Sequence, residues 1–301
     1  MRILVTGGAG YVGSALVPLL LAEGHQVRVL DYMRTGGRGL LSCCAHPRFE
    51  LVHRDMLDDE ALASALEGVD AIVHLAAIVG YPACRREPAY ARAINVDATR
   101  RLVELRERDQ RILFASTGSV YGKVRDTVCT EQTELNPLTL YGQSKAEAEQ
   151  LVLEGGNSVV YRYATAFGVS PSMRVDLLVN DFVHQAVHRG NLVVYQADSR
   201  RTLIHVRDMA RSIAFALRNW DAVVDDVYNV GDEKLNLSKA DIVTRIRERI
   251  NCYLHFAEFA ADPDQRDYEV SYEKIRAKGF TTEIDFETGL AELATAVRLV
   301  A

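Results

Sequence analysis

The feature that most constrains this chain is a glycine-rich turn placed directly after its first apolar run. The segment Thr6-Gly7-Gly8-Ala9-Gly10-Tyr11-Val12-Gly13 follows residues 2–5, and three of its glycines are spaced three apart. In such a turn the first glycine permits a sharp bend, the second lets the backbone approach a pyrophosphate, and the third lets helix and strand pack closely. The order of strand, turn and helix predicts a dinucleotide site at the helix N-terminus. We expect its contacts to come from Gly7, Gly10, Tyr11 and Val12.

An acidic residue at the end of the second apolar run indicates which dinucleotide binds. Asp31 follows Gly13 by 18 residues, near the spacing of the carboxylate that binds the adenosine ribose hydroxyls. A 2′-phosphate would face this charge, so the sequence favours NAD over NADP, although Arg34 and Arg38 follow closely. A turn-forming role for Asp31 is the simpler alternative. Asp55 and Met56, after the third strand, are placed to meet the adenine ring, or they belong to an acidic loop.

Alternating short β-branched runs and amphipathic stretches predict an α/β fold with a Rossmann doubly wound parallel sheet. We expect strands at 2–6, 26–31, 49–53, 70–75, 111–116 and 157–163, and helices at 11–23, 57–67, 88–108 and 139–155. The run at 70–75 is almost continuously apolar, as a central strand buried on both faces requires.

Beyond about residue 165 the alternation loosens. We predict helices at 173–189, 207–219, 238–250 and 286–299 and a strand at 192–195, which form a smaller C-terminal α/β substrate-binding lobe. The predicted division is an NAD-binding Rossmann domain at 1–165 and a mainly substrate-binding lobe at 166–301, with an approximate boundary that some segments cross. Ligands bind outside the carboxyl ends of such strands, so we expect the active site between these two parts.

A tyrosine and a lysine four residues apart predict the chemistry. Tyr141 and Lys145 lie on one face of the predicted helix 139–155. A nearby ammonium lowers the pKa of a phenol and helps it exchange a proton with a sugar hydroxyl. The strand 111–116 leads into Ser116-Thr117-Gly118-Ser119, whose hydroxyls can hydrogen-bond the reacting oxygen. A Ser/Thr-rich turn and a chance surface pair are the alternatives without function.

Composition excludes several classes of protein. A net charge of −6 without a long Lys/Arg run provides no footprint for nucleic acid or anionic lipid. The longest apolar runs are too short to span a bilayer, and the N-terminus lacks the pattern of a signal peptide. Five scattered cysteines, at 43, 44, 84, 129 and 252, have no spacing suited to zinc and suggest reduced thiols in the cytoplasm. We expect no metal.

Together these residues resemble the extended short-chain dehydrogenase/reductases, specifically the NAD-dependent epimerase/dehydratase family that acts on nucleotide sugars. The resemblance covers nearly the whole chain. Its matching pieces are residues 6–13, Asp31, 74–77, 95–96, 116–122, 141–145, 162–163, 167–168, 201–208, 228–231, 274–275 and 279–280.

The resemblance implies roles for individual residues. Tyr141 is the acid/base, Lys145 is its partner and also holds the nicotinamide ribose, and Thr117 is the hydroxyl beside the substrate. Leu75, Ala76 and Ala77 join the cofactor site. The implied contacts to the substrate, a nucleotide-diphosphate sugar, are Ser119, Asn180, Arg201 and Arg266; for the two arginines an ordinary ion pair is the alternative.

Departures from the family pattern narrow the predicted reaction. Members that dehydrate the sugar carry an Asp-Glu pair after the Thr, where this chain has Gly118 and Ser119; decarboxylating members keep a Glu at the second position. A Cys/Lys pair for epimerisation beside a ketone is not evident, since Cys84 fits a small apolar filler better. Thr165 stands where an Asn is usual, so one substrate contact differs from the common pattern.

The surviving hypothesis is a nucleotide-sugar epimerase that acts at sugar carbon 4 through a transient ketosugar. The alternatives are an NAD(P)-dependent nucleotide-sugar 4-ketoreductase or dehydrogenase with the same residues, and a silent dinucleotide-binding module. By the same resemblance, the helices at 88–108 and 139–155 meet their symmetry mates in a homodimer.

Overall fold

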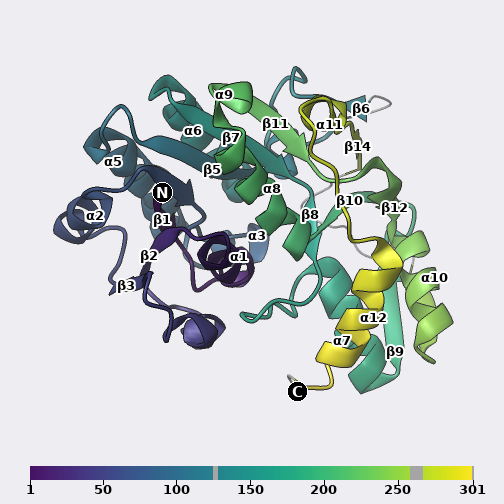
Figure 1. Cartoon of the computed structure of the whole chain (residues 1–301). Helices are drawn as coiled ribbons and strands as arrows, with labels where there is room; N and C mark the ends of the chain where they lie inside the picture. Colours follow the sequence, from purple (N-terminus) through teal and green to yellow (C-terminus); the bar gives the residue numbers. More distant parts are fainter. Residues whose placement is uncertain (125–127, 258–266, 300–301) are drawn as a thin grey trace.

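Seven parallel strands form the main sheet of the computed structural model, which describes residues 1–124, 128–257 and 267–299 (Figure 1). Their order across the sheet is β11-β7-β5-β4-β1-β2-β3. Strands β1 to β3 are added towards one edge of the sheet and the later strands towards the other, so the strand order reverses between β1 and β4. The point where the strand order reverses is the ligand-binding position of doubly wound sheets. The strands are β1 (Arg2–Thr6), β2 (Gln26–Asp31), β3 (Phe49–His53), β4 (Ala71–His74), β5 (Arg111–Thr117), β7 (Ser158–Tyr163) and β11 (Asp226–Val230).

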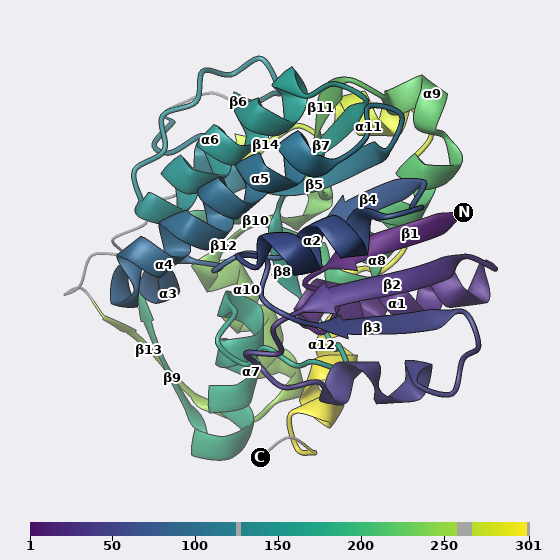
Figure 2. The same cartoon turned by 90° about the vertical axis from the view of Figure 1, so that its left-hand side faces the viewer.

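Helices cover both faces of this sheet, as Figure 2 shows. One face carries α1 (Tyr11–Ala22) and α8 (Val206–Arg218), and the other carries α2 (Asp59–Leu66), α5 (Ala98–Leu105) and α6 (Leu140–Glu154). Strand β1 supplies both layers, since Ile3 and Val5 pack towards α1 while Leu4 packs towards α2 and α5. All three side chains are fully buried, which explains why the strands are continuously apolar rather than alternating.

The predicted fold class and most predicted elements are confirmed, with ends that differ by a few residues. Two predicted helices are wrong in detail. The helix expected at 88–108 is α4 (Pro88–Arg92), a π-helical turn η2 (Ala93–Asp97) and α5. The helix expected from residue 173 begins later, as α7 (Leu178–Arg189), because residues 169–177 form a connecting loop that is tied to α1.

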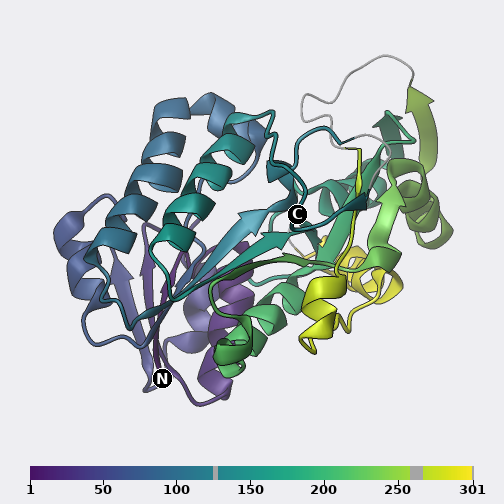
Figure 3. The ribbon, with the colours of Figure 1, turned by 90° about the horizontal axis from the view of Figure 1, so that it is seen from above.

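The C-terminal part has its own apolar cluster, which joins α7, α10 (Lys239–Arg249) and α12 (Phe286–Ala296). Figure 3 shows the green α10 and the yellow α12 beside the purple and blue N-terminal half. Its small sheets contain β8 (Thr165–Phe167), β10 (Arg200–His205) and β12 (Asn236–Ser238); β9 (Asn191–Tyr195) and β13 (Tyr253–Ala257); and β6 (Val128–Cys129) and β14 (Glu269–Val270). Short helical segments are η1 (Arg38–Cys43), α3 (Tyr81–Arg86), η3 (Gly118–Val120), α9 (Trp220–Val223), η4 (Glu233–Leu235) and α11 (Glu273–Ala277).

The chain crosses the expected division at residue 165 more than once. Strand β11 comes from the second half of the sequence but pairs with β7 in the main sheet. Helix α8 packs in the same apolar cluster as α1. The second half of the chain is therefore anchored on the sheet that carries the glycine-rich turn. None of the helices that the structure describes combines the length and apolar character needed to cross a bilayer.

Candidate active site

The glycine-rich turn is built for close backbone contact. Gly7 has φ of 72°, and a Cβ there would lie 2.7 Å from the backbone nitrogen of Ala76. The turn therefore touches the segment after β4 that contains Leu75, Ala76 and Ala77. Helix α1 begins at Tyr11 with Gly10 at its N-cap and no side chain capping its N–H groups. An uncapped helix N-terminus after a glycine turn suits a pyrophosphate, so these residues fit NAD.

Asp31 lies beside this turn. Its Oδ2 accepts a hydrogen bond from the backbone N–H of Ala9 at 2.9 Å, and its Oδ1 accepts one from Met33 at 2.6 Å. The half-buried carboxylate is thus aimed at the loop that would carry the pyrophosphate. The structure brings together the glycine turn and the predicted ribose ligand.

The predicted adenine residues lie after β3. The Asp55 carboxylate accepts hydrogen bonds from the Leu57 N–H at 3.0 Å and from the Tyr90 hydroxyl at 3.0 Å. The Met56 side chain is 4% exposed and packs in the apolar cluster between the sheet and helices α2 and α5. Any contact from Met56 to an adenine ring would therefore come mainly from its backbone, and the adenine role of both residues stays a prediction.

The start of helix α6, which carries Tyr141, meets the turn that follows β5 and contains Thr117 and Ser119. Helix α6 starts at Leu140 with Thr139 as its N-cap, whose hydroxyl accepts from the Gly142 N–H at 3.2 Å. A Cβ on Gly142 would lie only 2.9 Å from the Ser119 carbonyl oxygen, so the helix that carries Tyr141 starts against the 117–119 turn. Within that turn, the Thr117 hydroxyl accepts from the Ser119 N–H at 3.2 Å and donates to the Ser119 hydroxyl at 3.3 Å.

Lys145 is buried, with 3% of its surface exposed and its Nζ 3.9 Å from the centre of the Phe114 ring. Burial lowers the pKa of Lys145 to about 7, against the opposing charge of Glu149. Near neutral pH this ammonium is therefore close to losing its proton, and groups around it decide its charge.

A buried polar network under helix α6 was missed by the sequence analysis. The Glu149 carboxylate accepts from the Ser116 hydroxyl at 2.8 Å and from Nε of Arg162 at 3.0 Å. Arg162 also donates to the Tyr121 hydroxyl at 3.1 Å, which in turn donates to Asn229 at 2.6 Å. The network joins α6 to β5, β7 and β11. A signal was available, because Glu149 follows Lys145 by four residues and therefore lies on the same helix face.

Asn95 braces the site from the π-helical turn. Its Oδ1 accepts from the Ile78 N–H at 2.8 Å, and its Nδ2 donates to the Ile78 carbonyl at 3.1 Å and to the Ser144 hydroxyl at 3.0 Å. Ser144 donates to the Tyr141 carbonyl at 2.9 Å. Asn95 thus links the segment after β4 to helix α6, which carries the predicted catalytic residues. π-Helical turns are frequent at functional sites, but residues 93–97 carry no sequence signal for one.

Two of the predicted substrate contacts are occupied within the protein. Asn180 is fully buried; its Nδ2 donates to the Arg174 carbonyl at 2.8 Å, and its Oδ1 accepts from the Gly168 N–H at 3.0 Å. Arg201, on β10, is 4% exposed and donates to the Arg200 carbonyl at 2.7 Å. Their roles on a diphosphate stay predictions. Arg266 lies outside the described residues.

Arg174 is a cation near Tyr141, the predicted acid/base, that no sequence spacing had indicated. Its guanidinium donates to both oxygens of Asp176, at 2.7 Å and 2.6 Å. The hydrogen bond to Asp176 raises the pKa of Arg174, with smaller contributions from Tyr141 and Tyr11. The guanidinium is thus within electrostatic range of both tyrosines.

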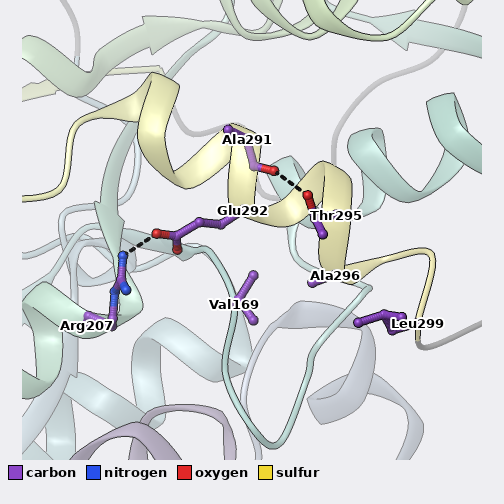
Figure 4. Close-up of a pocket in the computed structure, with 7 residues that line it drawn as sticks. All are labelled: Val169, Arg207, Ala291, Glu292, Thr295, Ala296 and Leu299. Atoms are coloured by element: carbon purple, nitrogen blue, oxygen red, sulfur yellow. Dashed lines mark hydrogen bonds and ion pairs between the residues drawn. The ribbon is translucent and has the colours of Figure 1, made fainter.

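A separate open pocket lies beside α12 (Figure 4). Its lining includes Val169, Leu299 and the ion pair between Arg207 and Glu292. None of the predicted catalytic residues lines it, so we assign it no part in the chemistry.

The fold and the site define an NAD-binding enzyme of the short-chain dehydrogenase/reductase type. The sequence profile of the NAD-dependent epimerase/dehydratase family matches residues 3–231. The low-salt glycan biosynthesis protein Agl12 of Haloferax volcanii is 31% identical in an alignment that covers 96% of each chain. The uncharacterized UDP-glucose epimerase YtcB of Bacillus subtilis is 31% identical in an alignment that covers 91% of each chain.

A solved structure extends this similarity. DesIV, a dTDP-glucose 4,6-dehydratase from Streptomyces venezuelae with NAD and TYD bound, has a TM-score of 0.86 and 28% identity, over 99% of this chain and 96% of DesIV. The chain belongs to the NAD-dependent epimerase/dehydratase family. It is an enzyme, and its cofactor is NAD.

Proposed function

We propose that the chain is a nucleotide-sugar epimerase that inverts carbon 4 of the sugar through a transient ketosugar. Bound NAD supplies a hydride acceptor and donor beside the sugar ring. Tyr141 takes the proton of the sugar hydroxyl and later returns it, while Thr117 and Ser119 hold the reacting oxygen. Lys145 stabilises the tyrosinate and holds the nicotinamide ribose, and Asn180 and Arg201 bind the nucleotide diphosphate.

The residues after Thr117 separate this reaction from dehydration. Elimination across the sugar needs an acid to expel a hydroxyl and a base to remove a carbon-bound proton. Gly118 and Ser119 stand at the two positions where dehydrating family members carry Asp and Glu. Neither residue can titrate in the required range, so hydride transfer with one acid/base group is the chemistry that the site supports.

A buried set of hydrogen bonds between α1 and residues 168–172 is the observation that favours an epimerase over a reductase. The Tyr11 hydroxyl donates to the Gly168 carbonyl at 2.6 Å, and the Ser170 hydroxyl donates to the Tyr11 carbonyl at 2.6 Å. The Ser14 hydroxyl meets that of Ser170 at 2.8 Å and accepts from the Ser172 N–H at 3.0 Å. These bonds tie the dinucleotide helix to the C-terminal part, which favours NAD that stays bound through the whole cycle.

The first test is to denature the purified protein and to measure NAD and NADH in the supernatant. We expect nearly one dinucleotide per chain. The retained protein is then incubated with UDP- and dTDP-hexoses without added cofactor, and the 4-epimer is followed by chromatography. An empty site would contradict the proposal and favour a ketoreductase or dehydrogenase. Retained NAD without turnover on the whole panel would favour the silent binding module.

We also propose a homodimer in the cytoplasm, paired through α5 and α6. Because α6 carries Tyr141 and Lys145, such pairing would brace the catalytic helix, and two-fold pairing is the commonest closed assembly. Light scattering at micromolar concentration should give twice the chain mass of 33.5 kDa. A mass of one chain would contradict the dimer without affecting the proposed reaction.

A further inference from the structure

The adenosine end of the cofactor site contains an arginine that could serve a different dinucleotide. Arg34 follows the ribose ligand Asp31 by three residues and lies in the loop after β2. A guanidinium near the adenosine ribose can bind a 2′-phosphate in a two-pronged hydrogen bond. Taken alone, Arg34 would therefore weaken the preference for NAD that Asp31 creates.

The structure engages this guanidinium elsewhere. Nη1 of Arg34 lies 3.2 Å from Oε2 of Glu87, and Nη2 bonds to the other carboxylate oxygen. The same guanidinium stands over the Tyr90 ring, 5.4 Å from its centre, and the Tyr90 hydroxyl bonds to Asp55. Both terminal nitrogens of the fork therefore face a carboxylate.

Glu87 is well placed to hold Arg34. It sits at the junction between α3 and α4, where the next residue is Pro88, the first residue of α4. The Arg34 and Glu87 side chains are 47% and 45% exposed, and ion pairs this exposed contribute little to folding stability. The hydrogen bond to Arg34 also lowers the pKa of Glu87, so the carboxylate stays ionised at neutral pH. Because the pair contributes so little to folding stability, a role in ligand binding can explain its presence better than a structural role.

We propose that Glu87 is a cofactor-specificity residue that keeps the site selective for NAD by engaging Arg34. With Glu87 in place, a 2′-phosphate meets the carboxylates of Asp31 and Glu87 and a guanidinium that already has a partner. Without Glu87, Arg34 is released and can pair with the phosphate. The proposal concerns cofactor binding alone and does not depend on the proposed reaction.

The test compares wild type, Glu87→Gln, Arg34→Ala and the double variant. Each holoenzyme is incubated with an equimolar excess of NAD and NADP until the bound ratio is constant, then desalted and denatured, and the two dinucleotides are counted. We expect Glu87→Gln to raise the bound NADP:NAD ratio about tenfold. Arg34→Ala alone should leave the ratio within about twofold of wild type, and the double variant should lose the gain.

Glu104→Gln is the matched control, because Glu104 is also an exposed partner of an arginine, Arg101 at 3.3 Å, but lies on α5. It should not change the ratio. An unchanged ratio in Glu87→Gln would overturn the proposal. A gain that persists in the double variant would overturn it as well, since Glu87 would then act through its own charge rather than through Arg34.

Discussion

The two ends of the dinucleotide site differ in how deeply their charges are buried. At the adenosine end, Arg34 and Glu87 form an ion pair that is nearly half exposed. At the reactive end, Arg162 and Glu149 form one whose side chains are 6% and 3% exposed. Exposed pairs are screened by water, whereas a buried charge that loses its partner is strongly unfavourable.

This difference in burial indicates which residues can be altered to change cofactor selectivity without loss of stability and which cannot. On the proposal above, a change in the exposed pair alters the choice of cofactor and has little effect on stability. Glu149 of the buried pair connects α6 to β5 and β7, so we expect a change there to alter the position of α6 and the stability of the fold together.

Removal of the acid/base should abolish turnover and leave the fold intact. Tyr141→Phe should lower kcat on the sugar identified above by about 10³-fold, because proton transfer by a positioned group contributes a factor of this order. Tyr195→Phe, on the exposed face of β9, is the control and should keep full activity. Unchanged kcat in Tyr141→Phe would contradict the proposed mechanism. It would also mean that this end of the dinucleotide site is not where the reaction takes place.

Breaking the buried pair should be the largest change in stability. Glu149→Ala leaves the Arg162 guanidinium buried without its carboxylate and should lower the free energy of unfolding by about 3–5 kcal/mol, measured by urea titration. Glu149→Leu combined with Arg162→Met removes both charges and should recover much of the loss. A loss below about 1 kcal/mol in Glu149→Ala would mean that burial does not distinguish the two ends.

Lys145→Met should stabilise the protein in a pH-dependent way. Burial lowers the pKa of Lys145 from 10.5 to about 7, so between these values the unfolded chain binds a proton that the folded chain lacks. The stability contributed by Lys145 therefore rises with pH over this window, and its penalty is fully present below pH 7. The gain in Lys145→Met should be a few kcal/mol at pH 6 and should shrink towards pH 10.

The measurement is urea unfolding of both proteins after removal of the dinucleotide. Lys234→Met, at an exposed position in η4, should give no gain that varies with pH. If Lys145→Met gives the same gain at pH 6 and pH 9, then its charge is not penalised by burial as inferred here.

The smallest structural effect is expected at the adenosine end. Glu87→Gln should shift Tm by less than about 1 °C, because the pair is exposed and screened. Differential scanning fluorimetry beside Glu149→Ala makes the comparison direct. A shift for Glu87→Gln as large as that for Glu149→Ala would end the contrast between a selectivity pair and a structural pair.

Local sequence spacing predicted much of the Rossmann sheet and the core of the site. The turn at residues 6–13, Asp31 at the end of β2, and Tyr141 with Lys145 all depend on positions within one strand–turn–helix unit or one helix. Backbone geometry sets those positions, since residues four apart share a helix face and a strand end has a fixed place at the sheet edge. The C-terminal part was predicted less well, because residues 169–177 follow their contacts with α1 rather than a helical period.

The sequence by itself determined the fold class and the cofactor of this protein and placed Tyr141 and Lys145 on one helix face, because each depends on a short local pattern. Only the tertiary structure decided which groups surround them. Arg34 meets Glu87 across 53 residues, and Asn180 meets Tyr11 across 169. Glu149 lies on the predicted face of α6, but its pairing with Arg162 depends on how α6 packs on β7. Contacts between elements follow from packing, which leaves no period in the sequence.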